Sequence, residues 1–97
     1  MPVIKAARYQ IRSTEREAAE RAMHEVTTRV RTTPHLSWSI YRADSHYLAI
    51  IHIERGDEDG LGWLAEALGP IELEVSECTL VTSSDLARRD VRKPRRR

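Results

Sequence analysis

The stretch Leu36–Ile53, with the sequence LSWSIYRADSHYLAIIHI, decides the fold because it predicts one β-hairpin with two chemically different faces. Side chains alternate between the two faces of a strand, so residues two positions apart share a face. A turn around Asp44-Ser45 places Arg42 opposite Tyr47. The same register gives two sets of facing pairs. One face holds Ile40 with Ala49, Trp38 with Ile51 and Leu36 with Ile53, and the other holds Tyr41 with Leu48, Ser39 with Ile50 and Ser37 with His52.

The two faces of this hairpin predict different surroundings. The face that contains Trp38 and Ile51 is almost wholly apolar, so it is expected to pack against helices. The opposite face carries hydroxyls, aliphatic groups and the imidazole of His52, where a solvated strand would carry Lys, Glu or Arg. We interpret this second face as the wall of a partly dry cavity.

Length and composition predict one small globular domain followed by a short tail. The chain has 97 residues, 40% of them hydrophobic and 32% charged, and we assign 1–84 to the domain and 85–97 to the tail. No apolar run approaches the roughly 20 residues that span a bilayer, and the N-terminus lacks a signal-like apolar segment. A single cysteine, Cys78, excludes an internal disulfide and favours a reducing, cytoplasmic location. The histidines and Cys78 show no metal-ligand spacing, so we expect no metal.

The net charge of +1 conceals two regions of opposite sign. Residues 88–97 contain seven basic residues and Asp90, which gives +6, and the remaining nine basic and fourteen acidic residues give −5. Such a tail is typical of disorder. It is expected to bind nucleic acid or an acidic surface, to act only as a solubilising terminus, or to fold back on the acidic body. The acidic body argues against nucleic acid as the main partner.

Before the hairpin, the sequence predicts a strand and a helix. Val3–Ile11 alternates loosely and contains Val, Ile and Tyr, which favours a strand. Thr14 and Glu17 fit a capping box at the start of the helix. An apolar stripe at three- and four-residue steps continues through Ala19, Ala22, Met23, Val26 and Val30.

After the hairpin, the sequence predicts a second helix and a last strand. An acidic turn, Gly56–Gly60, precedes the short amphipathic segment Leu61–Leu68, and Gly69-Pro70 ends it. Ile71–Val81 is then expected to form a strand. The order strand, helix, strand, strand, helix, strand predicts an α+β, ferredoxin-like βαββαβ fold: a four-stranded antiparallel sheet with two helices on one face. The uncovered face would expose Leu48 and Ile50, so we expect two copies to pair through it and to leave a cavity between them.

The segment Thr33–Arg42, TPHLSWSIYR, resembles the part of the antibiotic biosynthesis monooxygenase-like family where a turn leads into a strand that ends in an aromatic and a basic residue. The resemblance covers about residues 3–82 and implies the dimeric α+β barrel, a homodimer with a pocket beside each sheet. Some members oxidise aromatic polyketides with dioxygen and no metal or flavin, and others degrade haem. This chain departs from the family pattern at three places. His35 stands where the family often has glycine, Trp63 lies within the second helix rather than just after the third strand, and no histidine follows it.

Candidate site residues come mostly from the polar face of the hairpin. His52 is expected to act as a catalytic base on a phenol or enol, or alternatively to form only a structural hydrogen bond with Ser37. Tyr41 is expected to orient the substrate or to lie at the rim of the core. The other substrate-binding candidates on this face are Ser37, Ser39, Leu48 and Ile50. Arg8 is expected either to hold an anionic group of the substrate or to be a plain surface residue. Trp63 is expected to lie at a pocket mouth or at a dimer seam. Cys78 is expected to be a small buried residue.

Two functions follow from these residues and the resemblance. The first is a small cofactor-independent monooxygenase that acts on a hydrophobic, polyketide-like aromatic substrate. The alternative is a non-catalytic dimer of the same fold that binds a small molecule or serves assembly. Nucleic-acid binding through the arginine-rich tail is a third, weaker hypothesis.

Overall fold

The computed structural model describes residues 2–84, so the predicted basic tail, 85–97, lies outside the described residues. The elements follow the predicted order, with one added turn of 3-10 helix. They are β1 (Val3–Tyr9), η1 (Ser13–Glu15), α1 (Arg16–Arg31), β2 (Leu36–Arg42), β3 (Tyr47–Ile53), α2 (Leu61–Leu68) and β4 (Glu74–Cys78).

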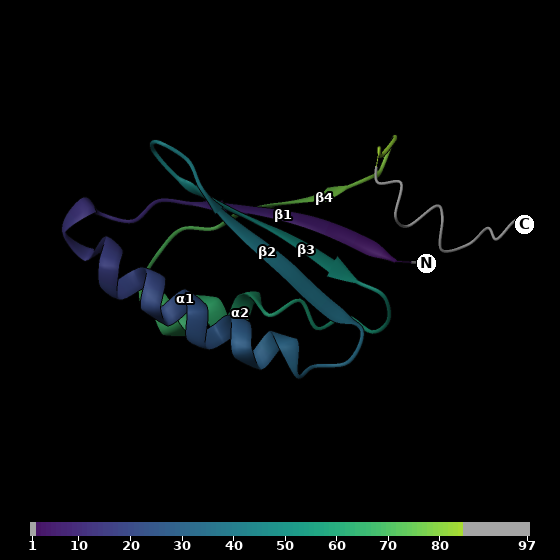
Figure 1. Cartoon of the computed structure of the whole chain (residues 1–97), viewed down its shortest axis with the longest axis horizontal. Coiled ribbons are helices and arrows are strands. Elements are labelled where there is room, and N and C mark those ends of the chain that lie inside the picture. Colours follow the sequence, from purple (N-terminus) through teal and green to yellow (C-terminus); the bar gives the residue numbers. More distant parts are fainter. Residues whose placement is uncertain (1, 85–97) are drawn as a thin grey trace, which may run out of the picture.

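The four strands form one antiparallel sheet in the order β2-β3-β1-β4. Both helices lie on the same side of this sheet, and the described part of the chain places no helix on the other side, as Figure 1 shows. This is the ferredoxin-like βαββαβ arrangement that the element order predicted. The sheet therefore has a helix-covered face and an open face.

The predicted hairpin register is confirmed pair by pair, from Arg42 opposite Tyr47 to Leu36 opposite Ile53. The Trp38 indole lies on the helix side, where its Nε1–H donates a hydrogen bond to Thr27 Oγ1 of α1 (2.8 Å). Ile51, on the same face, is fully buried. Burial of this apolar face against the helices is what fixes the register, because a slip by one residue would turn every side chain to the wrong side.

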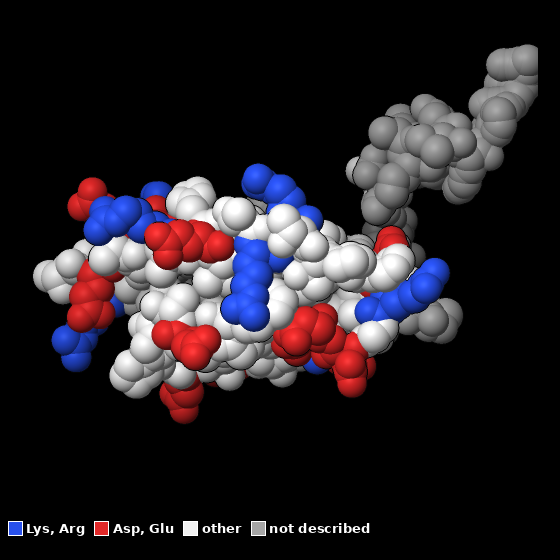
Figure 2. All heavy atoms as spheres, turned by 90° about the horizontal axis from the view of Figure 1, so that it is seen from below, with Lys and Arg blue, Asp and Glu red and all other residues white. Residues whose placement is uncertain are grey.

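The core lies between the sheet and the helices. The stripe predicted on the first helix supplies Met23, Val26 and Val30, and α2 supplies Leu61 and Leu64. The outer surface of the helix side carries acidic and basic residues side by side, without a large area of one sign (Figure 2). The helices thus separate an apolar core from a mixed, solvated surface.

The acidic turn before α2 stabilises the start of that short helix. Asp59 Oδ1 accepts a hydrogen bond from the Leu61 backbone N–H (3.0 Å), and Asp59 Oδ2 pairs with Lys5 Nζ of β1 (2.9 Å). The Glu58 carboxylate accepts a hydrogen bond from the Gly60 backbone N–H (2.9 Å). These contacts satisfy backbone donors that a helix start leaves free and tie α2 to the sheet.

Several predicted boundaries differ from the structure. The Thr14 capping box is wrong: a 3-10 turn at Ser13–Glu15 leads directly into α1, and no side-chain cap bonds to the helix start. The last strand is limited to Glu74–Cys78 because its ladder with β1 begins only at Glu74, while Ile71 and Leu73 pack against the core without pairing. Cys78 is exposed rather than buried, because β4 is an edge strand with no helix over it.

The turn before β2 places a non-glycine residue in the left-handed region. His35 has φ of 66°, and its backbone carbonyl accepts the Glu54 N–H (2.8 Å). Glycine adopts such a conformation without the steric cost that a side chain brings. His35 therefore occupies a position whose backbone favours glycine, the residue that the similar family often has there.

Candidate functional site

The open sheet face is a regular lattice of three rows that cross all four strands. Cross-strand pairing defines the rows as Ser37, His52, Ile4 and Cys78; then Ser39, Ile50, Ala6 and Ser76; then Tyr41, Leu48, Arg8 and Glu74. The two central strands contribute half-buried aliphatic groups to the middle of the lattice, and hydroxyls lie on β2. The structure thus brings seven of the eight predicted site residues onto one face.

His52 lies directly opposite Ser37, as predicted, but the two side chains form no hydrogen bond. Within residues 2–84, no hydrogen bond or ion pair reaches the imidazole, which is exposed. A purely structural role through Ser37 therefore lacks the contact it requires.

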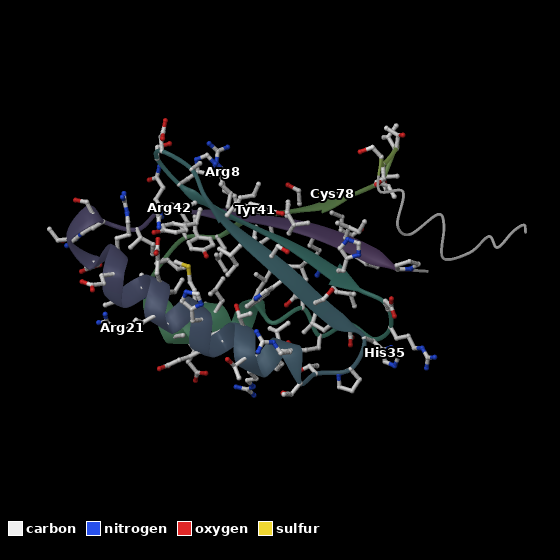
Figure 3. All side chains as sticks on the ribbon, viewed as in Figure 1. Arg8, Arg21, His35, Tyr41, Arg42 and Cys78 are labelled. Atoms are coloured by element: carbon white, nitrogen blue, oxygen red, sulfur yellow. The ribbon has the colours of Figure 1, made fainter. Side chains whose placement is uncertain are left out.

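Tyr41 and Arg8 belong to the row at the other end of the lattice, and Figure 3 shows them from the side of the molecule. Tyr41 is 58% exposed, so its ring is not a core group with only its hydroxyl at the rim. Ser37, Ser39 and Arg8 are exposed as well. In a single chain this face is therefore open to solvent, and the predicted dry wall requires something to cover it.

Two clefts lie elsewhere on the molecule. One, of about 980 Å³, is bounded by the start of α1, the end of α2 and the residues before β4, and of the predicted site residues only Arg8 borders it. The other, of about 500 Å³, lies between α1 and β2, and of the predicted site residues only Ser39 borders it. Neither is lined by His52 or Tyr41, and the cavity predicted over these two residues is one between two copies of the chain, so it stays a prediction.

Trp63 lies apart from the other predicted residues. It is part of α2, on the helix side of the sheet, and the Arg29 guanidinium of α1 stacks over its ring at 4.0 Å from the centroid. This cation–π contact joins the two helices. The sheet separates Trp63 from the open face, so it does not line the same site as His52 within one chain.

Sequence reasoning missed a polar cluster on the helix side, formed by Glu20, Arg42 and Tyr47. Glu20 of α1 accepts hydrogen bonds from Arg42 Nε (2.8 Å), Arg42 Nη2 (3.3 Å) and the Tyr47 hydroxyl (2.5 Å). Tyr47 also stacks on Tyr9, with ring centroids 5.6 Å apart. We call these three residues the Glu20 cluster.

The hydrogen bonds of the Glu20 cluster change the pKa values of its members. The bond from Arg42, followed by the bond from Tyr47, lowers the pKa of Glu20 below its usual 4.5. Burial raises the pKa of Tyr47, and the bond to Glu20 raises it further. Burial also raises the pKa of the stacked Tyr9. The folded chain therefore favours an ionised Glu20 beside two neutral phenols.

A lowered pKa in the folded state predicts a specific loss of stability in acid. Glu20 binds a proton more readily in the unfolded chain than in the folded one. Its contribution to the free energy of unfolding is therefore fully present above about pH 4.5, and it declines as pH falls through the lower pKa of the folded state. Glu20→Gln should therefore lower the free energy of unfolding at neutral pH, with a difference from wild type that shrinks below pH 4.5. Urea unfolding at a series of pH values measures this. A difference that stays constant through the acid range would contradict it.

Two further properties of residues 2–84 bear on possible partners. No three of their His, Cys, Asp and Glu side chains come together as a metal site. Among the helices formed by these residues, none combines the length and the apolar character that crossing a bilayer requires.

A ferredoxin-like α+β sheet with an open face is the class of protein that this geometry defines. Comparison with solved structures agrees: Rv0793 from Mycobacterium tuberculosis superposes with a TM-score of 0.59 over 87% of this chain and 100% of that chain, at 19% identity. A de novo designed protein, Foldit4, gives a TM-score of 0.46 at 13% identity over 82% of this chain and 99% of its own. No family model and no curated protein sequence matches the chain. The likeness to Rv0793 establishes the fold.

Proposed function

We propose that the protein is a homodimer whose open sheet faces pair and enclose a site for a hydrophobic aromatic molecule. The centre of the face supports this, because Ile4, Ala6, Leu48 and Ile50 form a continuous apolar area that neither helix of residues 2–84 covers. Contiguous exposed apolar areas mark interaction surfaces. The only Lys, Arg, Asp or Glu residues in the three rows are Arg8 and Glu74, which face each other on neighbouring strands. Two such faces therefore meet without a net repulsion between them.

A covered face of this kind supplies the surroundings that the hydroxyls and the imidazole need for chemistry. Aliphatic groups of the two sheets would hold the rings of the substrate, and Ser37, Ser39 and Tyr41 would bond its oxygens. His52, which has no partner within the described residues, would accept a proton. This unpartnered imidazole beside an apolar area is the single observation that carries the proposal of catalysis.

The reaction that fits these groups is a cofactor-independent monooxygenation of a polyketide-like aromatic, in line with the family resemblance of Thr33–Arg42. His52 removes a proton from a phenol or enol, and the electron-rich anion reduces dioxygen to form a carbon-bound hydroperoxide. Loss of water then leaves a quinone. One oxygen atom stays in the product and the other leaves as water, so dioxygen is the only oxidant required.

Oxygen uptake with an anthrone, a hydroxylated three-ring substrate, tests this function. Wild type is expected to consume one dioxygen per quinone formed. His52→Ala should lower the rate at least about a hundredfold, the smaller end of the effect of a general base. His46→Ala, in the hairpin turn, is the matched control and should keep the wild-type rate. Light scattering should give the same mass for all three proteins.

The same experiment distinguishes the oxygenase from the alternative function, a non-catalytic dimer that binds a small molecule or serves assembly. Saturable binding of the anthrone without oxygen uptake would support that alternative and reject the oxygenase. Full activity in His52→Ala would remove this residue from the mechanism. A wild-type monomer would reject the proposal as a whole.

A further inference from the structure

The cleft between α1 and the edge strand β2 is a second candidate site, independent of the proposed function because it lies on the opposite side of the sheet from His52. Its volume is about 500 Å³. Glu20, Met23 and Thr27 recur along one face of α1, and Trp38, Ile40 and Arg42 line it from β2. The strand runs antiparallel to the helix here, because Trp38 bonds to Thr27 and Arg42 bonds to Glu20.

The floor of this cleft is apolar and has the length of a small aromatic molecule. Met23 is buried, and Trp38 and Ile40 are half-buried. Trp38 and Arg42 are four strand residues apart, which corresponds to about 13 Å. A two-ring molecule fits along this distance, and a methionine sulfur and an indole both make favourable contacts with aromatic rings.

The polar groups of the cleft offer donors, because the main acceptor is already occupied. Glu20 accepts three hydrogen bonds from the other two members of its cluster. Arg42 uses Nε and Nη2 for Glu20, which leaves other N–H donors of its guanidinium, and its side chain is 58% exposed. Thr27 accepts the Trp38 N–H and, within the described residues, donates its own proton to no acceptor. The cleft therefore offers free hydrogen-bond donors that a ligand with acceptor oxygens can meet.

Two arginines lie near Glu20, and one of them, Arg42, lines the cleft. Arg42 balances Glu20, and the guanidinium of Arg16 lies close enough to act electrostatically on Glu20 and Tyr47. Arg16 Nε is buried and has no hydrogen-bond partner. Of the residues that line the cleft, Arg42 is the one with a guanidinium, and its remaining N–H donors can meet an anionic group.

We propose that this cleft binds an aromatic carboxylate, with its rings against Met23, Ile40 and Trp38 and its carboxylate on Arg42. The acid oxygens meet the free guanidinium donors, and the rings cover apolar area that faces the cleft. An uncharged aromatic of the same shape lacks the group that meets these donors. Binding needs no second copy of the chain.

Titration of the full chain with 2-naphthoate, followed by NMR of the two indole N–H groups, tests this site. The Trp38 indole signal should shift saturably, while the Trp63 signal, from the α2 side, should stay in place. The uncharged analogue 2-naphthalenemethanol should bind at least about tenfold more weakly, as expected for the loss of one charge-assisted hydrogen bond.

Variants separate this cleft from other sites. Arg42→Gln should weaken 2-naphthoate at least about tenfold, whereas Arg21→Gln, on the solvent side of α1, should bind as wild type does (Figure 3). His24→Glu tests the same charge preference at an exposed position of the rim and should also weaken binding, even if Arg42→Gln fails to fold. Equal affinity for the alcohol, unchanged binding by folded Arg42→Gln or by His24→Glu, or a Trp38 signal that stays in place would overturn the proposal.

Discussion

Leu48→Lys is expected to convert the proposed homodimer into a folded monomer of 11.2 kDa. Leu48 belongs to the apolar area of the open face and lies on the central strand β3, between Tyr41 and Arg8 of the neighbouring strands. In one chain it is only half-buried, so a lysine there can extend its ammonium into water and leave the core intact. In the dimer the same ammonium would be buried without a partner, at a cost of several kcal/mol.

Light scattering over a range of protein concentrations measures this change. Ala67→Lys adds the same charge on an exposed position of α2, on the helix side, and should remain dimeric. Urea unfolding should show that the Leu48→Lys monomer is folded. A Leu48→Lys protein that still has the dimer mass would place the dimer interface on another surface of the chain.

Ile51→Ala is expected to destabilise the fold by about 2–5 kcal/mol, the range for large-to-small substitutions at fully buried sites. Ile51 has no exposed surface and lies on β3, one of the two central strands. The alanine leaves a cavity between sheet and helices that the close-packed core cannot fill completely.

Ile50→Ala is the matched control because it removes the same atoms from the next residue, which faces the open side. Both substitutions are best compared by urea unfolding in the monomeric Leu48→Lys background, where dimerisation does not contribute to stability. Ile50→Ala should then cost clearly less than Ile51→Ala. Equal losses would mean that the two faces of β3 are buried to the same degree, contrary to the register seen here.

The hairpin was predictable because its register depends on residues that are close together in the sequence. A strict two-residue alternation and a polar turn fix which side chains share a face, and only one register places Trp38 and Ile51 together in the core. The same alternation placed His52 beside Ser37. The bounds of β4 were harder to predict from the sequence, because a strand ends where its hydrogen bonds to the neighbouring strand end. For β4 that neighbour is β1, which lies about seventy residues earlier in the chain.

The Glu20 cluster had only a faint signal in the sequence. Arg42 falls on the apolar face of the predicted hairpin, and a cation there calls for a carboxylate nearby. Nothing in the sequence says which of the acidic residues of α1 supplies it, because Glu20 lies 22 residues from Arg42 and is brought to it by helix packing. The cation–π contact of Arg29 with Trp63 arises in the same way, from the approach of two helices.

The sequence alone determined the order of the elements, the register of Leu36–Ile53 and the division of its side chains between two faces, because these depend on local alternation and turn chemistry. Tertiary structure decided where β4 begins and ends, where the clefts open and which charges meet. These features depend on contacts between residues far apart in the chain, and the free energy of packing the core selects them together.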